Sequence, residues 1–399
     1  MQSANIIDTV RIPRARSHAE KGAYAQVKPV ALLAPLFHAL QTRNDLDPTI
    51  VDDVLLGCST QSGEQGSNIA KMAAMYAGWP DSVPGASISR FCCSGSDAVN
   101  TSAAHVAAGM ASVMVAGGVE HLSRVPMFSD KGPWYTDKEV MRATRFMHMG
   151  LSADLIATRE GYSRARLDEL ALQSQQRAAH ASQAGHFANA LIPVTDSDGE
   201  PILQADDGIR TTSMEKLSAL PESFREFAPL AQKLVGFTYP GTELDCRHTA
   251  GNAPALVDGA SLVLLASENA CAEYGLKPRA KVRHFASASD EPVQMLTGHL
   301  RATEKLLSAT GLKSEDIDLW EINESFAASV LKYQQHFAID FDKLNVNGGA
   351  IAMGHPLGAT GGILIGMLLD ELEKRGLQRG LVAICGGAGV GVATLIERG

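Results

Sequence analysis

The chain has 399 residues, of which 45% are hydrophobic and 20% are charged. This size and composition are typical of a globular protein with two or three domains and a large buried core. The net charge of −9 argues against a broad nucleic-acid-binding face, so an anionic substrate would be met by local basic groups or helix N-termini. No segment approaches the roughly 18 continuous apolar residues of a membrane span, and we expect none.

The two ends of the chain and its cysteines indicate a location. A β-like run, Asn5-Ile6-Ile7, begins almost at once, which leaves no room for a signal or transit peptide. The six cysteines are scattered and have no Cys-x-x-Cys spacing, so we expect neither a metal site nor a disulfide framework. Free thiols are typical of a reducing compartment, and we therefore expect a cytoplasmic protein.

Strand and helix signals alternate through the first 117 residues. The pattern predicts strands at 3–8, 51–57, 85–89 and 112–117, and helices at 29–41, 68–77 and 94–110. Pro35 lies inside the first helix, where proline can cause a kink. The alternation predicts a layered α/β architecture.

The texture changes between residues 120 and 247, which are more polar and less regular. Helical signals appear at 152–160 and 167–184, and regular signals are weak from 193 onward. We expect this segment to form an inserted loop or lid domain. Regular structure resumes at 257–266, followed by strands at 281–286, 317–322, 381–384 and near 395, with helices at 299–309, 325–336 and 359–373.

The first and last thirds look like copies of one another. Asp53 precedes Cys92 by nearly the same interval as Asp318 precedes His355, and each interval ends in a turn that opens a small-residue helix. A repeat of this length indicates a duplicated domain, whose pseudo-twofold axis would place the two turns side by side. We therefore predict an N-terminal half of 1–119 plus 248–270, a lid domain of 120–247 and a C-terminal half of 271–399.

Two residues in these turns suit covalent acyl transfer. Cys92 lies at a strand-to-helix turn, where the helix dipole and free N–H groups favour the thiolate, so we expect a nucleophile. His355, in the turn Gly354-His355-Pro356, would take or return the proton. The alternatives are a small core cysteine and a structural histidine.

Two further sites have both a chemical and a structural interpretation. Cys385 is a second thiol beside Gly386 and Gly387, whose N–H groups could form an oxyanion hole or simply a turn between strands. Asn323 directly follows a strand, where it could hold a water or an oxyanion, or cap the next helix.

Four separated blocks resemble the thiolases, also called acetyl-CoA acyltransferases. They are Cys92-Cys93-Ser94-Gly95, Asn323-Glu324-Ser325-Phe326, Gly354-His355-Pro356-Leu357-Gly358 and Cys385-Gly386-Gly387. The resemblance covers nearly the whole chain in the expected order. It implies two similar five-stranded α/β halves stacked as α-β-α-β-α, with a loop domain inserted in the first half.

The resemblance also implies roles for the catalytic residues. Cys92 would be acylated, with His355 as its activating base, and Cys385 would shuttle the proton at the α-carbon of the acetyl unit. Asn323, through a water, and His355 would stabilise the enolate oxygen. The backbone N–H groups of Cys92 and Gly387 would form a second oxyanion hole.

CoA enters as a co-substrate, with no permanently bound cofactor. Contacts with CoA or the acyl-CoA substrate are implied for His148, Met149, Ala250, Ser325 and Phe326. Three other positions depart from the family pattern: Phe91 stands where many members have Gln, Cys93 where they have Ser, and Pro254 where a Ser usually hydrogen-bonds the pantetheine arm.

The implied activity is CoA-dependent cleavage of a 3-ketoacyl-CoA to acetyl-CoA and a shortened acyl-CoA, or the reverse condensation. Other condensing enzymes of the fold are an alternative, but they lack a second reactive cysteine such as Cys385. A non-catalytic acyl-CoA-binding subunit of a fatty-acid oxidation complex is another. The resemblance implies a homodimer or homotetramer, with a possible β-oxidation partner subunit, and leaves acyl chain length and direction open.

Overall fold

A computed structural model describes residues 3–399, so Met1 and Gln2 of the predicted N-terminal half lie outside it. The strands are β1 (Ala4–Arg11), β2 (Ala15–Arg16), β3 (Asp53–Gly57), β4 (Ala86–Ile88), β5 (Val113–Glu120), β6 (Val257–Ser267), β7 (Ala280–Ser289), β8 (Leu319–Ile322), β9 (Arg379–Cys385) and β10 (Val390–Glu397). The longer helices of the two halves are α1 (Pro29–Arg43), α2 (Ile69–Tyr76), α3 (Ser94–Ala107), α11 (Gly298–Thr310), α12 (Ala327–His336) and α14 (Thr360–Arg375).

The strand order contains the duplication that the sequence predicts. The main sheet path runs β4-β3-β5-β6-β1-β7-β10-β9-β8, so β8-β9-β10-β7 repeats the arrangement β3-β5-β6-β1. A bridge from Leu344 to Trp320 of β8 takes the place that β4 has beside β3. The halves meet where β1 pairs with β7, at Asn5–Lys281 and Ile6–Ala280.

Two aspartates hold equivalent places in the halves. Asp52 accepts hydrogen bonds from the N–H groups of Ser112 and Val113 at 2.6 and 3.0 Å. Asp318 accepts from Gln378 and Arg379 at 2.9 and 2.8 Å. Each carboxylate thus fixes the start of the neighbouring parallel strand. The partner of Asp318 in the repeat is therefore Asp52, one residue before the aspartate chosen from the sequence.

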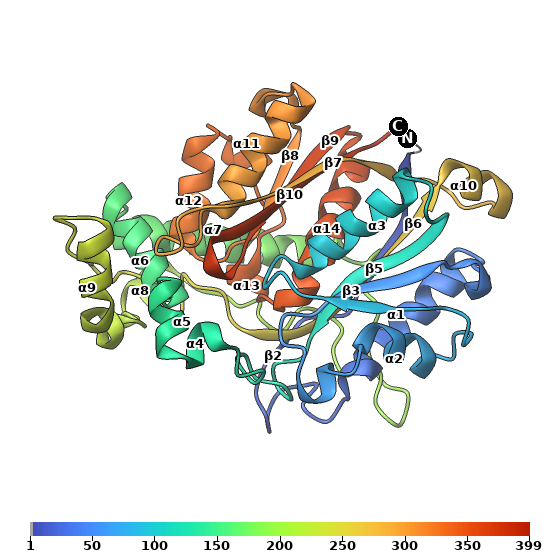
Figure 1. The fold of residues 1–399 in the computed structure, drawn as a ribbon, viewed down its shortest axis with the longest axis horizontal. Coiled ribbons are helices and arrows are strands. Elements are labelled where there is room, and N and C mark those ends of the chain that lie inside the picture. The colour runs from blue at the N-terminus through green and yellow to red at the C-terminus, as the bar shows by residue number, and fades with distance from the viewer. Residues whose placement is uncertain (1–2) are drawn as a thin grey trace.

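The elements form five layers (Figure 1). Helices α11 and α12 cover the C-terminal part of the sheet, α1 and α2 cover the N-terminal part, and α3 with α14 lie between. The central pair approaches closely at glycines: a Cβ on Gly361 would lie 1.9 Å from the backbone N of Ser96, and one on Gly95 would lie 2.5 Å from the carbonyl oxygen of Gly358. The predicted α-β-α-β-α fold is confirmed, and its glycines bring the Cys92 and His355 turns together.

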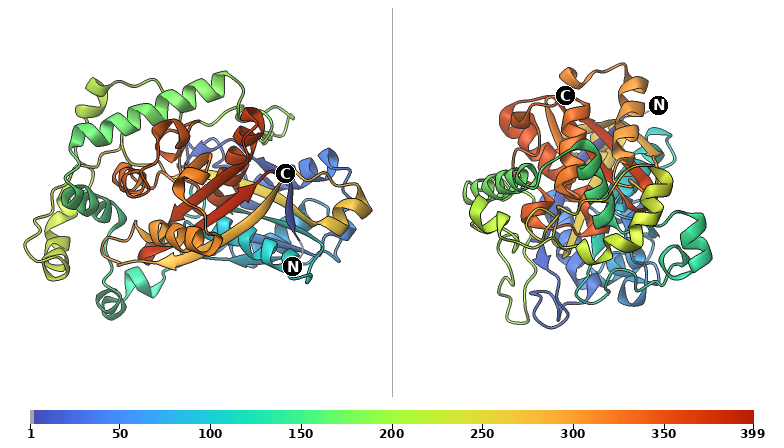
Figure 2. Two further views of the ribbon diagram at one scale, coloured as in Figure 1. Left: turned by 90° about the horizontal axis from the view of Figure 1, so that it is seen from above. Right: turned by 90° about the vertical axis from the view of Figure 1, so that its left-hand side faces the viewer.

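Residues 120–247 leave the main sheet after β5 and form a mostly helical segment before the chain returns at β6. They contain α4 (Pro133–Thr136), α5 (Lys138–Ala143), α6 (Met149–Glu160), α7 (Arg164–Gln183), α8 (Met214–Ser218) and α9 (Ala228–Thr238). Figure 1 and the left view of Figure 2 place α9 and its neighbours at one end of the molecule. The sequence indicated only α6 and α7, and the domain boundaries stay predictions.

Several local expectations differ in detail. Helix α3 ends at Ala107 rather than 110, and α12 begins at Ala327 rather than 325. Helix α1 continues through Pro35 to Arg43. All six cysteines are free, and within residues 3–399 no helix is long and apolar enough to cross a membrane.

Candidate active site

Cys92 lies in a tight turn between β4 and α3. Phe91 has a φ of +51°, which a bulky side chain rarely adopts, so the turn is locally strained. The N–H groups of Cys93 and Ser94 donate to the carbonyls of Arg90 and Phe91, each at 3.1 Å, and the Ser94 hydroxyl accepts from the Arg90 N–H at 2.8 Å. These bonds hold the Cys92 side chain just ahead of the first turn of α3.

The environment of Cys92 opposes the ionisation that the sequence predicts. Burial raises the pKa of the thiol to about 12, and the neighbouring Cys385 and Glu120 act in the same direction. The N–H groups of Cys92 and Gly387 favour the thiolate but do not outweigh burial. The expected net lowering of the Cys92 pKa is therefore wrong for the free protein, although backbone N–H groups do favour the thiolate. Cys92 is a neutral thiol at rest and needs a base.

Cys93 points away from the site. Its thiol is fully buried and donates to the carbonyl oxygen of Ile384 at 3.3 Å. Burial raises its pKa well above that of a free cysteine, and Cys92 acts in the same direction. Cys93 therefore packs between α3 and the sheet as a small apolar residue.

The His355 ring is anchored through one nitrogen and open at the other. Its Nδ1 lies 2.7 Å from the Thr360 hydroxyl, while its Nε2 is buried without a hydrogen-bond partner in the described structure. Burial, together with the nearby charge of Arg14, lowers the pKa of the ring to about 4. The imidazole is therefore neutral, with one nitrogen anchored and the other free to accept a proton.

The turn that carries His355 is clamped to the N-terminal half. The His355 N–H donates to the carbonyl of Ala255 at 2.9 Å. The buried carboxylate of Glu120, at the end of β5, accepts from the N–H of Gly358 at 2.9 Å and from Ser59 at 2.9 Å. Glu120 thus ties the His355 segment to the strand beside Cys92, and the distance between the two turns depends on it.

Cys385 and Asn323 share a serine. The Cys385 thiol donates to Ser325 Oγ at 3.1 Å, and Asn323 Nδ2 donates to the same oxygen at 2.9 Å. Asn323 Oδ1 is buried without a partner in the described structure. The cap of α12 is Phe326, so Asn323 is not the helix cap that the sequence left open.

One cavity of about 240 Å³ brings most of the predicted site together. It is lined by Cys92, His355 and Cys385 from the core, and by His148, Met149, Ser325 and Phe326 from the positions expected to contact CoA. Pro254, which replaces a family serine, also lines it. Asn323 reaches the cavity only through Ser325, and Ala250 is exposed outside the lining, so the structure does not bring Ala250 to this cavity.

Residues 120–247 supply an aromatic wall to the cavity. The His148 ring lies 5.9 Å from the ring of Phe227 in a stacked arrangement and 5.3 Å from Phe224. Phe224 in turn packs edge-on to Phe326 at 6.0 Å. His148 and Phe326 are thus linked by one row of aromatic rings, although His148 precedes α6 and Phe326 precedes α12.

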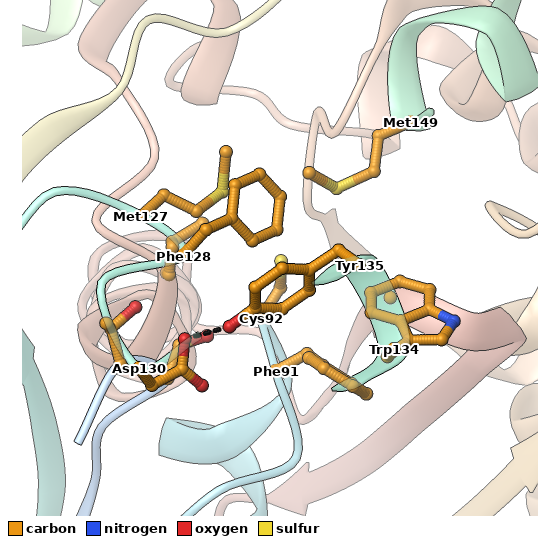
Figure 3. Close-up of a pocket in the computed structure, with 12 residues that line it drawn as sticks. Phe91, Cys92, Met127, Phe128, Asp130, Trp134, Tyr135 and Met149 are labelled. Atoms are coloured by element: carbon orange, nitrogen blue, oxygen red, sulfur yellow. Dashed lines mark hydrogen bonds between the residues drawn. The ribbon is translucent and has the colours of Figure 1, made fainter. Parts of the chain in front are cut away.

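A second, narrower pocket of about 50 Å³ opens beside Cys92 (Figure 3). Gly387 lines it together with Phe91, and the lid contributes Trp134, Tyr135 and Asp130. The sequence does not predict these three residues or Thr360 as part of the site, and the family match at Glu120 assigns that residue no role. Two features of the sequence could have indicated them. Trp134 and Tyr135 are adjacent aromatic residues in an irregular segment, and Thr360 closely follows the glycine-rich turn that carries His355.

Comparison with known proteins gives a consistent result. Residues 4–269 match the family model for the thiolase N-terminal domain, and residues 276–398 match that for the C-terminal domain. The chain is 38% identical to the steroid 3-ketoacyl-CoA thiolase FadA6 of Mycobacterium tuberculosis, covering 100% of this chain and 95% of that protein. It is 39% identical to a beta-ketoadipyl-CoA thiolase of Pseudomonas knackmussii, covering 98% of each.

A solved structure agrees with these relatives. The crystal structure of human mitochondrial 3-ketoacyl-CoA thiolase superposes with a TM-score of 0.87 at 28% identity, covering 100% of this chain and 99% of that one. The two family models together cover nearly the whole chain. The thiol of Cys92 and the imidazole of His355, one from each matched region, line the same cavity. The chain belongs to the thiolase family of acyltransferases.

Proposed function

We propose that this protein catalyses CoA-dependent thiolytic cleavage of a 3-ketoacyl-CoA, or the reverse condensation, through an acyl-Cys92 intermediate. The observation that carries the proposal is the unpartnered Nε2 of His355 in the cavity that also contains the thiols of Cys92 and Cys385. A neutral imidazole can take the proton of the Cys92 thiol as the sulfur attacks, so the thiol need not ionise beforehand.

In the first half-reaction Cys92 Sγ attacks the 3-keto carbon while His355 Nε2 takes the thiol proton. The bond between C2 and C3 then breaks, and its electron pair leaves with the acetyl-CoA unit as an enolate. Cys385 protonates that carbon, which gives acetyl-CoA and an acyl thioester on Cys92. The N–H groups of Cys92 and Gly387 stabilise the oxyanion of the tetrahedral adduct.

In the second half-reaction the thiol of CoA attacks the acyl-Cys92 carbonyl. Its proton restores Cys385, the proton on His355 returns to Cys92, and a shortened acyl-CoA leaves. In the first half-reaction the enolate oxygen accepts hydrogen bonds from His355 and from a water that Asn323 Oδ1 holds by accepting its other hydrogen. The same steps in reverse give condensation, so CoA is a co-substrate and the direction follows the concentrations of the reactants.

The setting of this activity is part of the proposal. We place the enzyme in the cytoplasm as a homodimer or homotetramer. Either assembly could also bind a partner subunit of β-oxidation. Residues 120–247 act as the lid over the CoA arm, with 1–119 plus 248–270 and 271–399 as the two catalytic halves. Of the predicted CoA contacts, His148, Met149, Ser325 and Phe326 are proposed to line its path.

The test is loss of the 3-keto absorbance when the protein is mixed with CoA and acetoacetyl-CoA, and then with longer 3-ketoacyl-CoA substrates. Turnover that disappears in Cys92→Ala supports the proposal. A non-catalytic acyl-CoA-binding subunit would bind these substrates without turnover, and absence of turnover with short, medium and long chains would overturn the proposal. Turnover of Cys385→Ala at the rate of the unmodified enzyme would favour another condensing chemistry of the same fold.

A further inference from the structure

The narrow pocket beside Cys92 is built mainly from aromatic rings. Phe91 packs against Trp134 with ring centroids 5.2 Å apart, and Phe128 packs against Tyr135 at 4.4 Å. Figure 3 places Trp134 on one side of Cys92, and Phe128 and Asp130 on the other. Since the acyl group in the proposed mechanism is attached to Cys92, these rings bound the space into which it extends.

The lining of this pocket carries negative charge and no positive charge. Asp130 is the only charged side chain among the twelve lining residues that the structure describes, and none of the twelve is Lys or Arg. Lys131 follows Asp130 in the chain but does not line the pocket. A carboxylate at the far end of an acyl group would therefore meet a like charge without any cation to offset it.

Asp130 is exposed to solvent on one side, and one of its carboxylate oxygens is anchored by a neighbouring side chain. The Tyr135 hydroxyl donates a hydrogen bond to Asp130 Oδ1, and the same hydroxyl accepts from the Gly132 N–H at 2.8 Å. The Tyr135 ring is in turn packed against Phe128. The carboxylate therefore has a fixed position at the wall of the pocket.

We propose that Asp130, anchored by Tyr135, is a specificity-determining residue that makes this enzyme select uncharged acyl groups and reject acyl groups that end in a carboxylate. The proposal rests on the thiolase activity proposed above. The aromatic walls act in the same direction, because an anion that leaves water for an apolar slot loses hydration that the slot does not replace. On this inference the protein would differ in substrate from its relative named beta-ketoadipyl-CoA thiolase, because a ketoadipyl group ends in a carboxylate.

A pair of matched substrates tests the inference. 3-Ketoadipyl-CoA ends in a carboxylate, and 3-keto-6-methylheptanoyl-CoA replaces it with an isopropyl group of the same shape. We expect kcat/KM to be about tenfold or more lower for the carboxylate, from like-charge repulsion and lost hydration. Most of the difference should be in KM, because the charge lies away from the reacting carbon.

Two variants assign the effect to Asp130. Asp130→Asn should raise the ratio of kcat/KM for 3-ketoadipyl-CoA to that of the isopropyl substrate severalfold, and Asp130→Arg should raise it further. Asp198→Asn removes one negative charge from an exposed residue outside the pocket and should leave the ratio unchanged. Equal use of the two substrates by the unmodified enzyme, or a ratio that Asp130→Asn does not move, would overturn the inference.

Acetoacetyl-CoA distinguishes this inference from the proposed function. Its acyl side carries only a methyl group beyond the keto carbon and no charge, so its turnover reports the thiolase reaction without a test of charge selection. If acetoacetyl-CoA is cleaved and the two matched substrates are used equally, only the inference fails. If no 3-ketoacyl-CoA is cleaved, the proposed function fails and the inference fails with it.

Discussion

Ser325 Oγ lies 3.1 Å from the Cys385 thiol and accepts its hydrogen bond, while the same oxygen accepts from Asn323 Nδ2 at 2.9 Å. The serine therefore orients the second thiol and leaves Asn323 Oδ1 directed elsewhere. A single hydroxyl thus couples the proposed proton donor to the proposed enolate site, and its removal affects one half-reaction more than the other.

The first prediction concerns that hydroxyl. Ser325→Ala should slow exchange of the acetyl-CoA methyl hydrogens with deuterated water by about tenfold to a hundredfold, since a misplaced catalytic group costs this much. Acetylation of Cys92 by acetyl-CoA, measured by mass spectrometry, should change far less. The matched control is Ser329→Ala, because Ser329 Oγ lies 3.8 Å from the same thiol and donates mainly to Leu296. Equal losses in both half-reactions would contradict this role.

The second prediction separates the adjacent cysteines. Iodoacetamide should label Cys92 first, because Cys92 lines the cavity while Cys93 is fully buried with its thiol bonded to Ile384. Bound acyl-CoA should protect Cys92, and Cys93 should react only in denaturant. Peptide mapping follows both sites, and Cys93→Ser should leave the Cys92 labelling rate nearly unchanged. Preferential modification of Cys93 in the folded protein would overturn the assignment of the nucleophile.

The third prediction is a pH profile. The pKa of His355 is lowered to about 4 by burial, so the base is lost only when the pH falls through that value. An unperturbed histidine would cost about tenfold in kcat/KM between pH 7.5 and 5.5, and we expect a nearly flat profile over this range. The Cys92 thiol, with a pKa raised to about 12, should add no basic limb below pH 9. An acid limb centred near pH 6.5, in protein whose fluorescence remains native, would contradict the structure.

The fourth prediction concerns the approach of the two central helices. An added methyl in Gly361→Ala would lie 1.9 Å from the backbone N of Ser96, so α14 must move away from α3. We expect a loss of about 1–3 kcal/mol in the free energy of unfolding, together with a loss of turnover because the Cys92 and His355 turns separate. The melting temperature and kcat report the two effects.

Gly236 supplies the control for that substitution. It lies inside α9, and a Cβ there would meet nothing within 4 Å. Gly236→Ala should therefore stabilise the helix by about 0.5–1 kcal/mol, the usual gain for alanine over glycine. A variant Gly361→Ala that melts at the same temperature as Gly236→Ala would show that the central helices are not tightly packed.

The sequence predicts the parts of this protein that depend on local pattern. The alternation of strands and helices, and the similar turns at Cys92 and His355, indicate the duplicated fold because each copy must bury the same faces. Helix α8 has only five residues and depends on tertiary packing, and α9 leaves most of its residues outside the core, so neither has a clear sequence signal. Local pattern therefore gives the layers of the fold and leaves the lid largely undefined.

The candidate site divides in the same way. The three reactive side chains of Cys92, His355 and Cys385 are visible as motifs, and they lie in one cavity. The direction of the Cys92 pKa is not visible, because burial depends on the elements packed around the turn and outweighs the helix end. The aromatic pocket with Asp130 is invisible for a similar reason, since it forms only when the lid folds against the core.

The pairing of β1 with β6 has a consequence for synthesis of the chain. Ala4 finds its partner only at Ser267, after the whole segment 120–247 has been made. At ordinary translation rates the first strand therefore waits roughly 15–50 s on the ribosome with its edges unpaired. The nascent N-terminal half therefore cannot complete its sheet, or bury the residues around Cys92, until β6 has left the ribosome.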